Sequence, residues 1–286
     1  MTYRELLANA AKRLAAAGIA EAQNDARLLL FEAAQLTFAG LLAKYEDPVP
    51  DSVESAYKNF IAKRESRLPL QIIIGKTEFM GLEFMTDGKT LIPRQDTELL
   101  VEKALEYSKA AAAKSLLDIC TGSGCIAIAL CRYGSFERIC AGDVFEEVLS
   151  RAKENAVING ADGMIDFRRS DMFDAFEGER FDVITCNPPY IKTGDIKDLM
   201  PEVKDYDPPA ALDGGPDGLD FYRIIAKKAA DHLTLNGALF LEIGYDQARE
   251  VSELLAGEGF EETTVFADHS GNDRLIKAVF KGLPEK

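Results

Sequence analysis

From residue 114 onward, short apolar runs alternate with segments of helical spacing, and this alternation constrains the fold more than any other feature of the chain. Strands that alternate with helices pair in parallel, because each connection must cross over the sheet. The pattern therefore predicts an α/β unit with a mostly parallel, doubly wound sheet. The predicted strands cover residues 115–119, 138–142, 165–168, 181–186, 238–243, 263–266 and 275–280.

The first predicted strand runs into a glycine-containing turn that opens a helix. Gly122 and Gly124 permit a tight turn and a close approach of a ligand to the backbone. The next strand ends at Asp143, where a carboxylate can accept hydrogen bonds from ribose hydroxyls. These residues indicate a cofactor that contains a nucleoside, either NAD or S-adenosylmethionine. A glycine turn that serves only packing is the alternative.

A carboxylate and an apolar side chain follow the third predicted strand, in the sequence Ser170-Asp171-Met172. Asp171 can bind the exocyclic amine of an adenine, and Met172 can contact its face. Taken alone, these residues are common in loops. Their position after a strand supports an adenine site, because the carboxyl ends of parallel strands meet at one edge of the sheet, where ligands bind.

The fourth predicted strand ends in the sequence Asn187-Pro188-Pro189-Tyr190. The two prolines lack the N–H group that a central strand needs, so the chain leaves the sheet at Asn187 with a stiff backbone. This group can hold a planar –NH2: Asn187 Oδ1 and the Pro188 carbonyl each accept one hydrogen, and Tyr190 covers the face. A purely packing role for Tyr190 is the alternative.

The same motif favours S-adenosylmethionine over NAD. A dehydrogenase needs a group that handles an alcohol proton, commonly His, Lys or Tyr, and the two histidines, His232 and His269, lie away from this edge in the sequence. A nitrogen methyltransferase mainly needs to orient a weak nucleophile, because the methylated nitrogen loses its proton readily. We therefore expect an enzyme that acts on an amide or amino nitrogen.

The N-terminal part of the chain has a different pattern. Residues 1–67 are predicted to be helical, with Thr2 and Glu5 forming a capping box at the first helix. Residues 71–74 and 82–85 are predicted to be the two arms of a β-hairpin. We expect three parts, listed in order: a helical substrate-docking domain at 1–67, a β-hairpin linker at 68–92 and the methyltransferase domain at 93–286.

Composition limits the classes of partner. The net charge is −15, from 33 basic and 48 acidic residues. Non-specific affinity for nucleic acid comes mainly from Lys and Arg on phosphate, so we expect no direct nucleic-acid partner, although plain solubility explains the charge equally well. No run of about eighteen apolar residues is present, and the five cysteines form no CxxC pair. We expect a cytoplasmic monomer with no metal site and no membrane contact.

Six segments of the chain resemble one family in both residues and order. The family is the release factor glutamine methyltransferases of the HemK type, and the resemblance covers nearly the whole chain. The Asn-Pro-Pro-Tyr motif alone is shared with adenine-N6 DNA methyltransferases and some rRNA guanine methyltransferases. The Ile-Pro-Arg segment and the helical N-terminal domain are much more specific. The six segments are 92–98, 118–124, 187–190, 212–219, 241–244 and 271–274.

The resemblance implies a class I (Rossmann-like) domain with a seven-stranded sheet and S-adenosylmethionine as methyl donor. It implies that the acceptor is the glutamine in the Gly-Gly-Gln loop of a peptide chain release factor. The catalytic and substrate-binding residues implied are Asn187, Pro188, Pro189 and Tyr190. The donor-binding residues implied are Cys120, Thr121, Gly122, Ser123, Gly124, Asp143, Asp171, Met172 and Asn187.

The chain departs from the family's pattern at three positions. Cys120 stands where glycine is usual, and Gln95 stands where proline is usual. Met172 replaces a frequent aromatic residue, so contact with the adenine face is expected to be weaker or made differently. None of the three changes removes a group that the chemistry requires.

Other interpretations stay open on the sequence alone. A DNA or rRNA base methyltransferase shares the fold, the cofactor and the –NH2 clamp, but it needs a basic groove. A nicotinamide-dependent dehydrogenase is indicated by the glycine turn alone, and the intact clamp disfavours a non-enzymatic scaffold. The loop at 205–222 is predicted either to border the acceptor cleft or to be a plain connection. We expect Cys186 to be buried in its strand and Glu242 to lie behind the site.

Overall fold

The computed structural model describes residues 1–282, so the last residues of the expected 93–286 domain lie outside the described part. The chain divides into two compact units. Unit 1 comprises Met1–Lys76 together with Met200–Tyr206, which we call the crossing segment. Unit 2 comprises Thr77–Leu199 and the chain from Asp207 onward. The chain therefore enters unit 1 twice.

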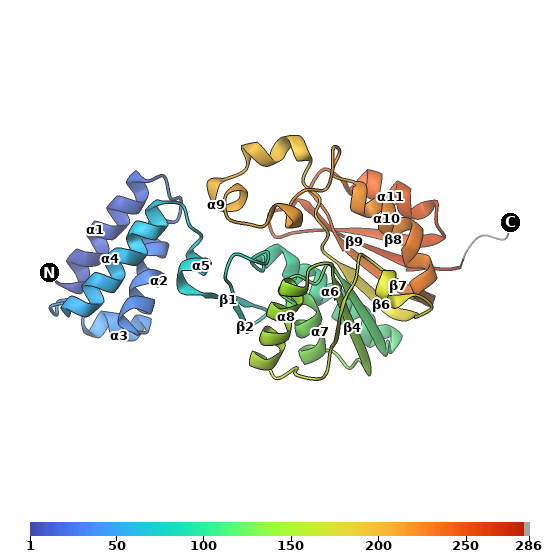
Figure 1. The fold of residues 1–286 in the computed structure, drawn as a ribbon, viewed down its shortest axis with the longest axis horizontal. Helices are drawn as coiled ribbons and strands as arrows, with labels where there is room; N and C mark the ends of the chain where they lie inside the picture. Colours follow the sequence, from blue (N-terminus) through green and yellow to red (C-terminus); the bar gives the residue numbers. More distant parts are fainter. Residues whose placement is uncertain (283–286) are drawn as a thin grey trace. The chain divides into compact units, whose positions relative to one another are not determined.

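Unit 1 is a cluster of helices around one apolar core. Figure 1 shows α1, α2 and α4 packed against one another, in blue. The predicted capping box at the start of α1 is present, because the Thr2 hydroxyl accepts the Glu5 N–H and the Glu5 carboxylate accepts the Thr2 N–H. The helices of unit 1 are α1 (Tyr3–Ala16), α2 (Ala22–Ala34), α3 (Phe38–Ala43), α4 (Asp51–Glu65), α5 (Leu70–Ile74) and α9 (Pro201–Lys204).

A buried ion-pair network joins the crossing segment to the rest of unit 1. Arg64 donates from Nε to Asp25 Oδ2 at 2.8 Å and from Nη2 to Glu202 Oε1 at 2.9 Å. Arg67 Nη2 donates to the other oxygen of Glu202 at 2.5 Å. The side chains of Arg64 and Asp25 are each 8% exposed. Because both carboxylates are paired with guanidinium groups, their burial is tolerated.

Residues 71–74 form a helix and not the first arm of a hairpin, so that prediction is wrong. Pro69 precedes α5, and Gly75 ends it with a φ of 87° in the left-handed region that favours glycine. The apolar side chains of α5 pack on the core of unit 1, and this tertiary contact overrides the strand propensity of consecutive isoleucines. A hairpin follows instead, in which β1 (Lys76–Phe79) pairs with β2 (Leu82–Met85).

Unit 2 contains a seven-stranded sheet in the order β5-β4-β3-β6-β7-β9-β8. Strands β3 to β7 pair in parallel, whereas β9 is antiparallel to both β7 and β8. The predicted α/β class and the seven-stranded sheet are confirmed. The strands are β3 (Ser115–Ile119), β4 (Arg138–Asp143), β5 (Asp166–Arg169), β6 (Phe181–Cys186), β7 (Leu233–Glu242), β8 (Phe260–Ala267) and β9 (Asp273–Phe280).

Helices cover both faces of this sheet. In β6, Val183 belongs to the apolar cluster under α6 and α7, while the next residue, Ile184, belongs to the cluster under α10 and α11. Both faces are therefore buried, as parallel sheets require. The helices of unit 2 are α6 (Glu98–Ala111), α7 (Cys125–Tyr133), α8 (Glu146–Ile158), α10 (Asp220–Ala229) and α11 (Ala248–Ala256). The short 3-10 helices are η1 (Gln95–Thr97), η2 (Asp174–Phe176), η3 (Thr193–Asp198), η4 (Pro209–Ala211) and η5 (Ala230–His232).

The strand register brings the predicted polar residues to one edge of the sheet. Ile119 of β3 is paired with Gly142 of β4 and with Cys186 of β6. Asp143, which ends β4, and Asn187, which follows β6, therefore lie at the same edge of the sheet. Cys186 is fully buried, as expected for a strand residue. This edge is where ligands bind in open parallel sheets.

Candidate active site

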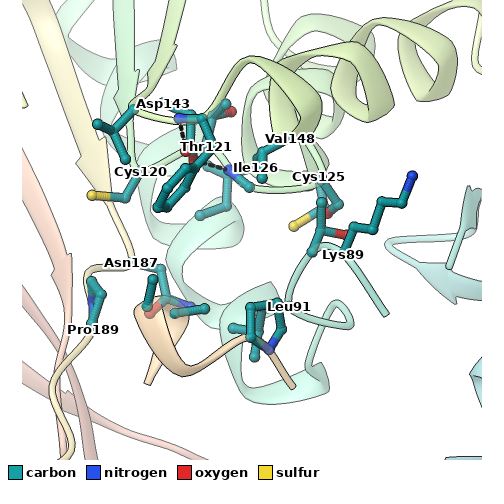
Figure 2. Close-up of a pocket in the computed structure, with 18 of the residues that line it drawn as sticks. Lys89, Leu91, Cys120, Thr121, Cys125, Ile126, Asp143, Val148, Asn187 and Pro189 are labelled. Atoms are coloured by element: carbon teal, nitrogen blue, oxygen red, sulfur yellow. Dashed lines mark hydrogen bonds between the residues drawn. The ribbon is translucent and has the colours of Figure 1, made fainter. Parts of the chain in front are cut away.

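A cavity of about 370 Å³ opens in unit 2 at the carboxyl edge of the sheet. In Figure 2, Thr121 and Asp143 lie across from Asn187 and Leu91 around this cavity. Its volume lies in the range of small-molecule sites, about 300–1,000 Å³. Most of the predicted donor-binding residues line it, namely Cys120, Thr121, Gly122, Ser123, Asp143, Asp171, Met172 and Asn187. Apolar side chains complete the wall, among them Leu91, Ile126, Phe145, Val148 and Phe221.

The remaining predicted residues are placed around this cavity in different ways. Pro189 lines it together with Asn187, whereas Pro188 and Tyr190 are not among the lining residues. Gly124 does not line the cavity either. A Cβ on Gly124 would come within 3.0 Å of Ile128 Cδ1 and 3.1 Å of Ala152 Cβ. Gly124 therefore allows α7 and α8 to pack closely behind the turn.

Two of the departures from the family pattern lie in the left-handed region of the backbone. Cys120 has a φ of 55° and Met172 has a φ of 50°. For a residue with a Cβ this conformation costs about 1–2 kcal/mol, which explains why glycine is usual at the first position. The two sulfur atoms are 3.8 Å apart. The side chains of the two residues thus form one apolar surface of the cavity.

Asp143 faces the cavity with its plane fixed by the backbone. Its Oδ2 accepts the Gly122 N–H at 3.0 Å, and its Oδ1 accepts the Phe145 N–H at 3.2 Å. Burial raises the pKa of the Asp143 carboxyl, and the backbone hydrogen bonds oppose that rise. Each carboxylate oxygen has two lone pairs, so both oxygens keep capacity to accept hydroxyl hydrogens from a ligand.

Asp118 stabilises the turn from beneath, and sequence analysis gave it no role. Its carboxylate is fully buried and accepts the Thr121 hydroxyl at 2.6 Å and the Thr185 hydroxyl at 2.7 Å. Burial raises the pKa of Asp118 to about 7, and the two hydroxyl groups oppose the rise. The residue joins the turn after β3 to strand β6. An acid within an apolar strand was the only sequence signal for this link.

Asn187 is connected to a buried carboxylate through a residue from a distant segment. Asn187 Nδ2 donates to Thr97 Oγ1 at 3.3 Å, and the Thr97 hydroxyl donates to Glu242 Oε2 at 2.6 Å. The other oxygen of Glu242 accepts the Tyr190 hydroxyl at 3.3 Å. Two residues of the Asn-Pro-Pro-Tyr motif are thus held by one carboxylate at the end of β7.

Glu242 is buried, and the charges of Arg274 and Asp96 act on its carboxyl group together with these partners. Burial raises the pKa of Glu242, whereas the Thr97 hydroxyl and the positive charge of Arg274 lower it. Burial also raises the pKa of Tyr190, and the charge of Glu242 raises it further. The Tyr190 phenol therefore stays protonated at neutral pH and acts as a hydrogen-bond donor. The Tyr222 hydroxyl donates to the backbone carbonyl of Glu242 at 2.8 Å.

The loop at 205–222, whose part from residue 207 onward we call the glycine-rich loop, braces the Asn-Pro-Pro-Tyr motif. The Gly214 N–H donates to the Ile191 carbonyl at 2.8 Å, and the Ile191 N–H donates to the Leu212 carbonyl at 2.9 Å. A Cβ on Gly214 would lie 2.7 Å from Tyr190 Cα and 2.9 Å from the Pro189 carbonyl oxygen, so only glycine fits there. The loop also borders the cavity, which favours the first of its two interpretations. Its lining residues are Pro208, Ala210, Ala211 and Asp213.

The Ile-Pro-Arg segment forms another wall of the cavity through Ile92, Pro93 and Arg94. Arg94 Nη2 donates to Asp207 Oδ2 at 2.5 Å. The Asp207 side chain is 1% exposed, so this ion pair fixes the start of the glycine-rich loop against the segment. Arg94 lies in one of the segments of the family pattern and Asp207 lies outside all of them, so the sequence analysis did not predict this contact.

Within residues 1–282, no group of three or more His, Cys, Asp or Glu side chains is placed to hold a metal ion. No helix in this part of the chain is long and apolar enough to cross a membrane. The five cysteines are free thiols.

The cavity fits a nucleoside-containing methyl donor. The Asp143 carboxylate suits ribose hydroxyls, and the apolar wall around Met172 suits a purine ring. A Cβ on Gly122 would meet only the Cys120 carbonyl, at 3.9 Å, so a ligand can approach the backbone there. With a seven-stranded sheet and an amide-bearing motif at its edge, the fold and the site define an S-adenosylmethionine-dependent methyltransferase of class I.

Comparison with known proteins narrows the class. The PrmC N-terminal domain model matches residues 5–75, and the methyltransferase small domain model matches residues 95–202. A release factor glutamine methyltransferase from Agrobacterium fabrum is 40% identical over 276 residues, which is 95% of this chain and 95% of the relative. One from Geobacter sulfurreducens is 38% identical and covers 96% of this chain and 95% of its own length. The chain belongs to the release factor glutamine methyltransferase family.

Solved structures agree with the fold. A methyltransferase structure from Pyrococcus furiosus matches with a TM-score of 0.52 and 20% identity, over 72% of this chain and 91% of that chain. At this level of identity the match supports the class I fold and carries no information on the acceptor.

Proposed function

We propose that this protein methylates the side-chain amide nitrogen of the glutamine in the Gly-Gly-Gln motif of a peptide chain release factor. The observation that carries the proposal is the placement of Asn187. It lines the cavity while its Nδ2 is occupied by Thr97 Oγ1, so its Oδ1 is available to an incoming –NH2 group. Membership of the family supports the acceptor. The net charge of −15 favours a protein over a nucleic acid.

The donor site in this proposal consists of the residues that line the turn side of the cavity. Asp143 accepts the ribose hydroxyls, and Asp171 with Met172 holds the adenine by its amine and its face. Residues 120–124 surround the methionine end, with Gly124 acting through packing. Bound there, S-adenosylmethionine supplies an electrophilic methyl group on a sulfonium.

The acceptor site consists of the Asn-Pro-Pro-Tyr motif. A glutamine amide nitrogen is a weak nucleophile, because its lone pair is delocalised into the carbonyl. Asn187 Oδ1 and the Pro188 carbonyl accept its two hydrogens and fix its π-face toward the donor side. Acceptors outside the amide plane favour pyramidalisation, which returns the lone pair to nitrogen. Positioning of this kind can lower a barrier by several kcal/mol, on the order of 7 or more in favourable cases.

The transfer needs little further acid-base chemistry. The N–C bond forms as the S–C bond breaks, and the methylated nitrogen then releases its extra proton to water. The products are N5-methylglutamine and S-adenosylhomocysteine. Pro189 limits the space beside the amide, and Tyr190 covers the motif with its hydroxyl held by Glu242. We propose that the protein does this as a cytoplasmic monomer, without direct contact to nucleic acid.

Labelled S-adenosylmethionine and a purified release factor test the proposal. Mass spectrometry should find one added methyl group on the glutamine of the Gly-Gly-Gln peptide, and none when that glutamine is replaced by alanine. Asn187→Ala should reduce the rate by at least about 100-fold and leave the donor dissociation constant within about threefold. Methylation at another residue, or of DNA or rRNA offered in parallel, would reject the acceptor. Undiminished turnover of Asn187→Ala would reject the clamp.

A further inference from the structure

We infer that Thr97 and Glu242 are positioning residues that decide which end of the Asn187 side-chain amide faces the acceptor. The inference rests on the proposed clamp role of Asn187. The two ends of a primary amide are nearly equal in size, but only the oxygen accepts a hydrogen from an –NH2 group. A clamp with Asn187 Nδ2 turned to the acceptor would set donor against donor.

The directions of the hydrogen bonds from Asn187 through Thr97 to Glu242 fix the orientation of the Asn187 side-chain amide. A threonine hydroxyl has one hydrogen. Thr97 Oγ1 is 2.6 Å from Glu242 Oε2, a length typical of a hydroxyl that donates to a carboxylate. With its hydrogen used there, Thr97 Oγ1 can only accept from Asn187, and the amide can donate only through Nδ2. Asn187 Oδ1 is therefore turned away from Thr97.

The carboxylate of Glu242 is held in place from several sides. Its second oxygen accepts the Tyr190 hydroxyl, and its backbone carbonyl accepts the Tyr222 hydroxyl. The residue is 3% exposed, so water cannot easily replace these partners. Burial raises the pKa of this carboxyl group, and the Thr97 hydroxyl, the charge of Arg274 and the Tyr190 hydroxyl oppose that rise. In its ionised form the carboxylate only accepts hydrogen bonds, so the Thr97 hydroxyl donates to it at 2.6 Å.

Thr97, like Glu242, is buried and held by hydrogen bonds. It is 2% exposed and ends η1, where its backbone N–H donates to the Arg94 carbonyl at 3.1 Å. The hydroxyl therefore belongs to the segment that forms a wall of the cavity. Three segments that are far apart in sequence meet in one hydrogen-bond chain: the end of η1, the motif after β6 and the end of β7.

The first test uses two substitutions at Thr97. Thr97→Val keeps the shape but removes the hydroxyl, so the amide loses its directing partner. We expect kcat to fall about 10- to 100-fold, the size expected for misplacement of a reacting group. The donor dissociation constant and the KM for the release factor should stay within about threefold. Thr97→Ser keeps the hydroxyl and should recover most of the rate. A Thr97→Val enzyme within about twofold of the wild-type kcat would overturn the inference.

The second test asks whether Thr97 and Glu242 act on Asn187 through the same series of hydrogen bonds. Glu242→Leu removes the acceptor, which frees the Thr97 hydroxyl to donate to Asn187 and hold the amide in the reversed orientation. Adding Thr97→Val to Glu242→Leu should then cause no further loss of kcat. Losses that multiply would show independent roles and overturn the inference. Donor titration and thermal unfolding of each variant establish that it is folded.

A spectroscopic readout separates positioning from stability. With 15N-labelled asparagine, the side-chain NH2 signal of Asn187 is the one that Asn187→Ala removes. In Thr97→Val this signal should shift, because one of its hydrogens loses its acceptor, while other asparagine signals stay. An unshifted signal would contradict the contact. If Asn187→Ala itself kept full turnover, the clamp would fail, whereas a harmless Thr97→Val beside an inactive Asn187→Ala would refute only this inference.

Discussion

Arg64 of α4 and Glu202 of the crossing segment form a 2.9 Å ion pair although 138 positions separate them in the sequence. The same guanidinium also holds Asp25 of α2. Unit 1 is therefore completed by a short piece of chain taken from the middle of the methyltransferase sequence. This piece lies between the Asn-Pro-Pro-Tyr motif and the glycine-rich loop, so it joins two segments that build the candidate active site.

Loss of the Arg64 cation should destabilise unit 1 strongly. Arg64→Met leaves the carboxylates of Asp25 and Glu202 buried without this partner, which we expect to cost about 3–5 kcal/mol in the free energy of unfolding. The matched control is Lys58→Ala, which breaks the exposed pair with Glu54 and should cost less than about 1 kcal/mol. Denaturant unfolding followed by circular dichroism measures both. Equal losses in the two variants would contradict the network's role.

Asp118 should make stability depend on pH. Its folded-state pKa is raised from 3.8 to about 7 by burial, so between these values the unfolded chain releases a proton that the folded chain keeps. The stabilisation is complete below pH 3.8 and is lost as pH rises through about 7. The free energy of unfolding should fall by up to about 1.4 kcal/mol per pH unit. Asp118→Asn removes this decline, and a constant difference between the variant and the wild type across this range would refute it.

Asp143 should govern affinity for the donor. Asp143→Ala removes the proposed acceptor for ribose hydroxyls and releases the Gly122 N–H. We expect the dissociation constant of S-adenosylmethionine to rise about 10- to 100-fold, in keeping with the loss of hydrogen bonds to a charged group. Calorimetric titration measures it. Asp162→Ala, at an exposed position, is the control and should bind as the wild type does. Unchanged affinity of Asp143→Ala would place the ribose elsewhere.

Gly214 should be required for the geometry of the Asn-Pro-Pro-Tyr motif. In Gly214→Ala the new methyl group would meet the Tyr190 backbone at 2.7 Å, so the motif must move. We expect kcat to fall at least about 10-fold with little change in donor affinity. Gly194→Ala is the matched control, because a Cβ there has nothing within 4 Å. If both variants kept the wild-type kcat, the close approach of Gly214 to the Tyr190 backbone would not be needed for catalysis.

Much of unit 2 could be predicted because the central strands β3 and β6 are largely buried apolar runs. The predicted bounds of β3 and β6 match the structure, whereas β7 begins at Leu233 instead of residue 238. The early part of β7 includes Asn236, with a φ of 63°, before Gly237. Such residues normally indicate a turn, but here β7 pairs with β6 on either side of them, at Leu233 and at Ala238, so the strand continues across a bulge. The prediction of a hairpin arm at residues 71–74 was wrong for a related reason, because tertiary packing overrides local propensity there.

The candidate site could be predicted only where its residues follow strands. Asp143 and Asn187 were predicted because the ends of parallel strands converge, a rule that sequence alone can apply. The contact of Thr97 with Asn187 and Glu242 could not, because it joins three segments through tertiary packing. The family pattern contains all three segments, but order along a chain does not specify a hydrogen bond. The contact between Arg94 and Asp207 could not be predicted either, because it too joins segments that are far apart in the sequence.

The divided composition of unit 1 has a consequence for its synthesis. A chain emerging from the ribosome exposes Met1–Lys76 well before the Met200–Tyr206 segment exists. Until then the Arg64 guanidinium lacks the Glu202 carboxylate, so the helices can collapse early but cannot reach their final pairing. Completion of the helical unit must therefore wait until the Asn-Pro-Pro-Tyr motif, which precedes this segment, has been translated.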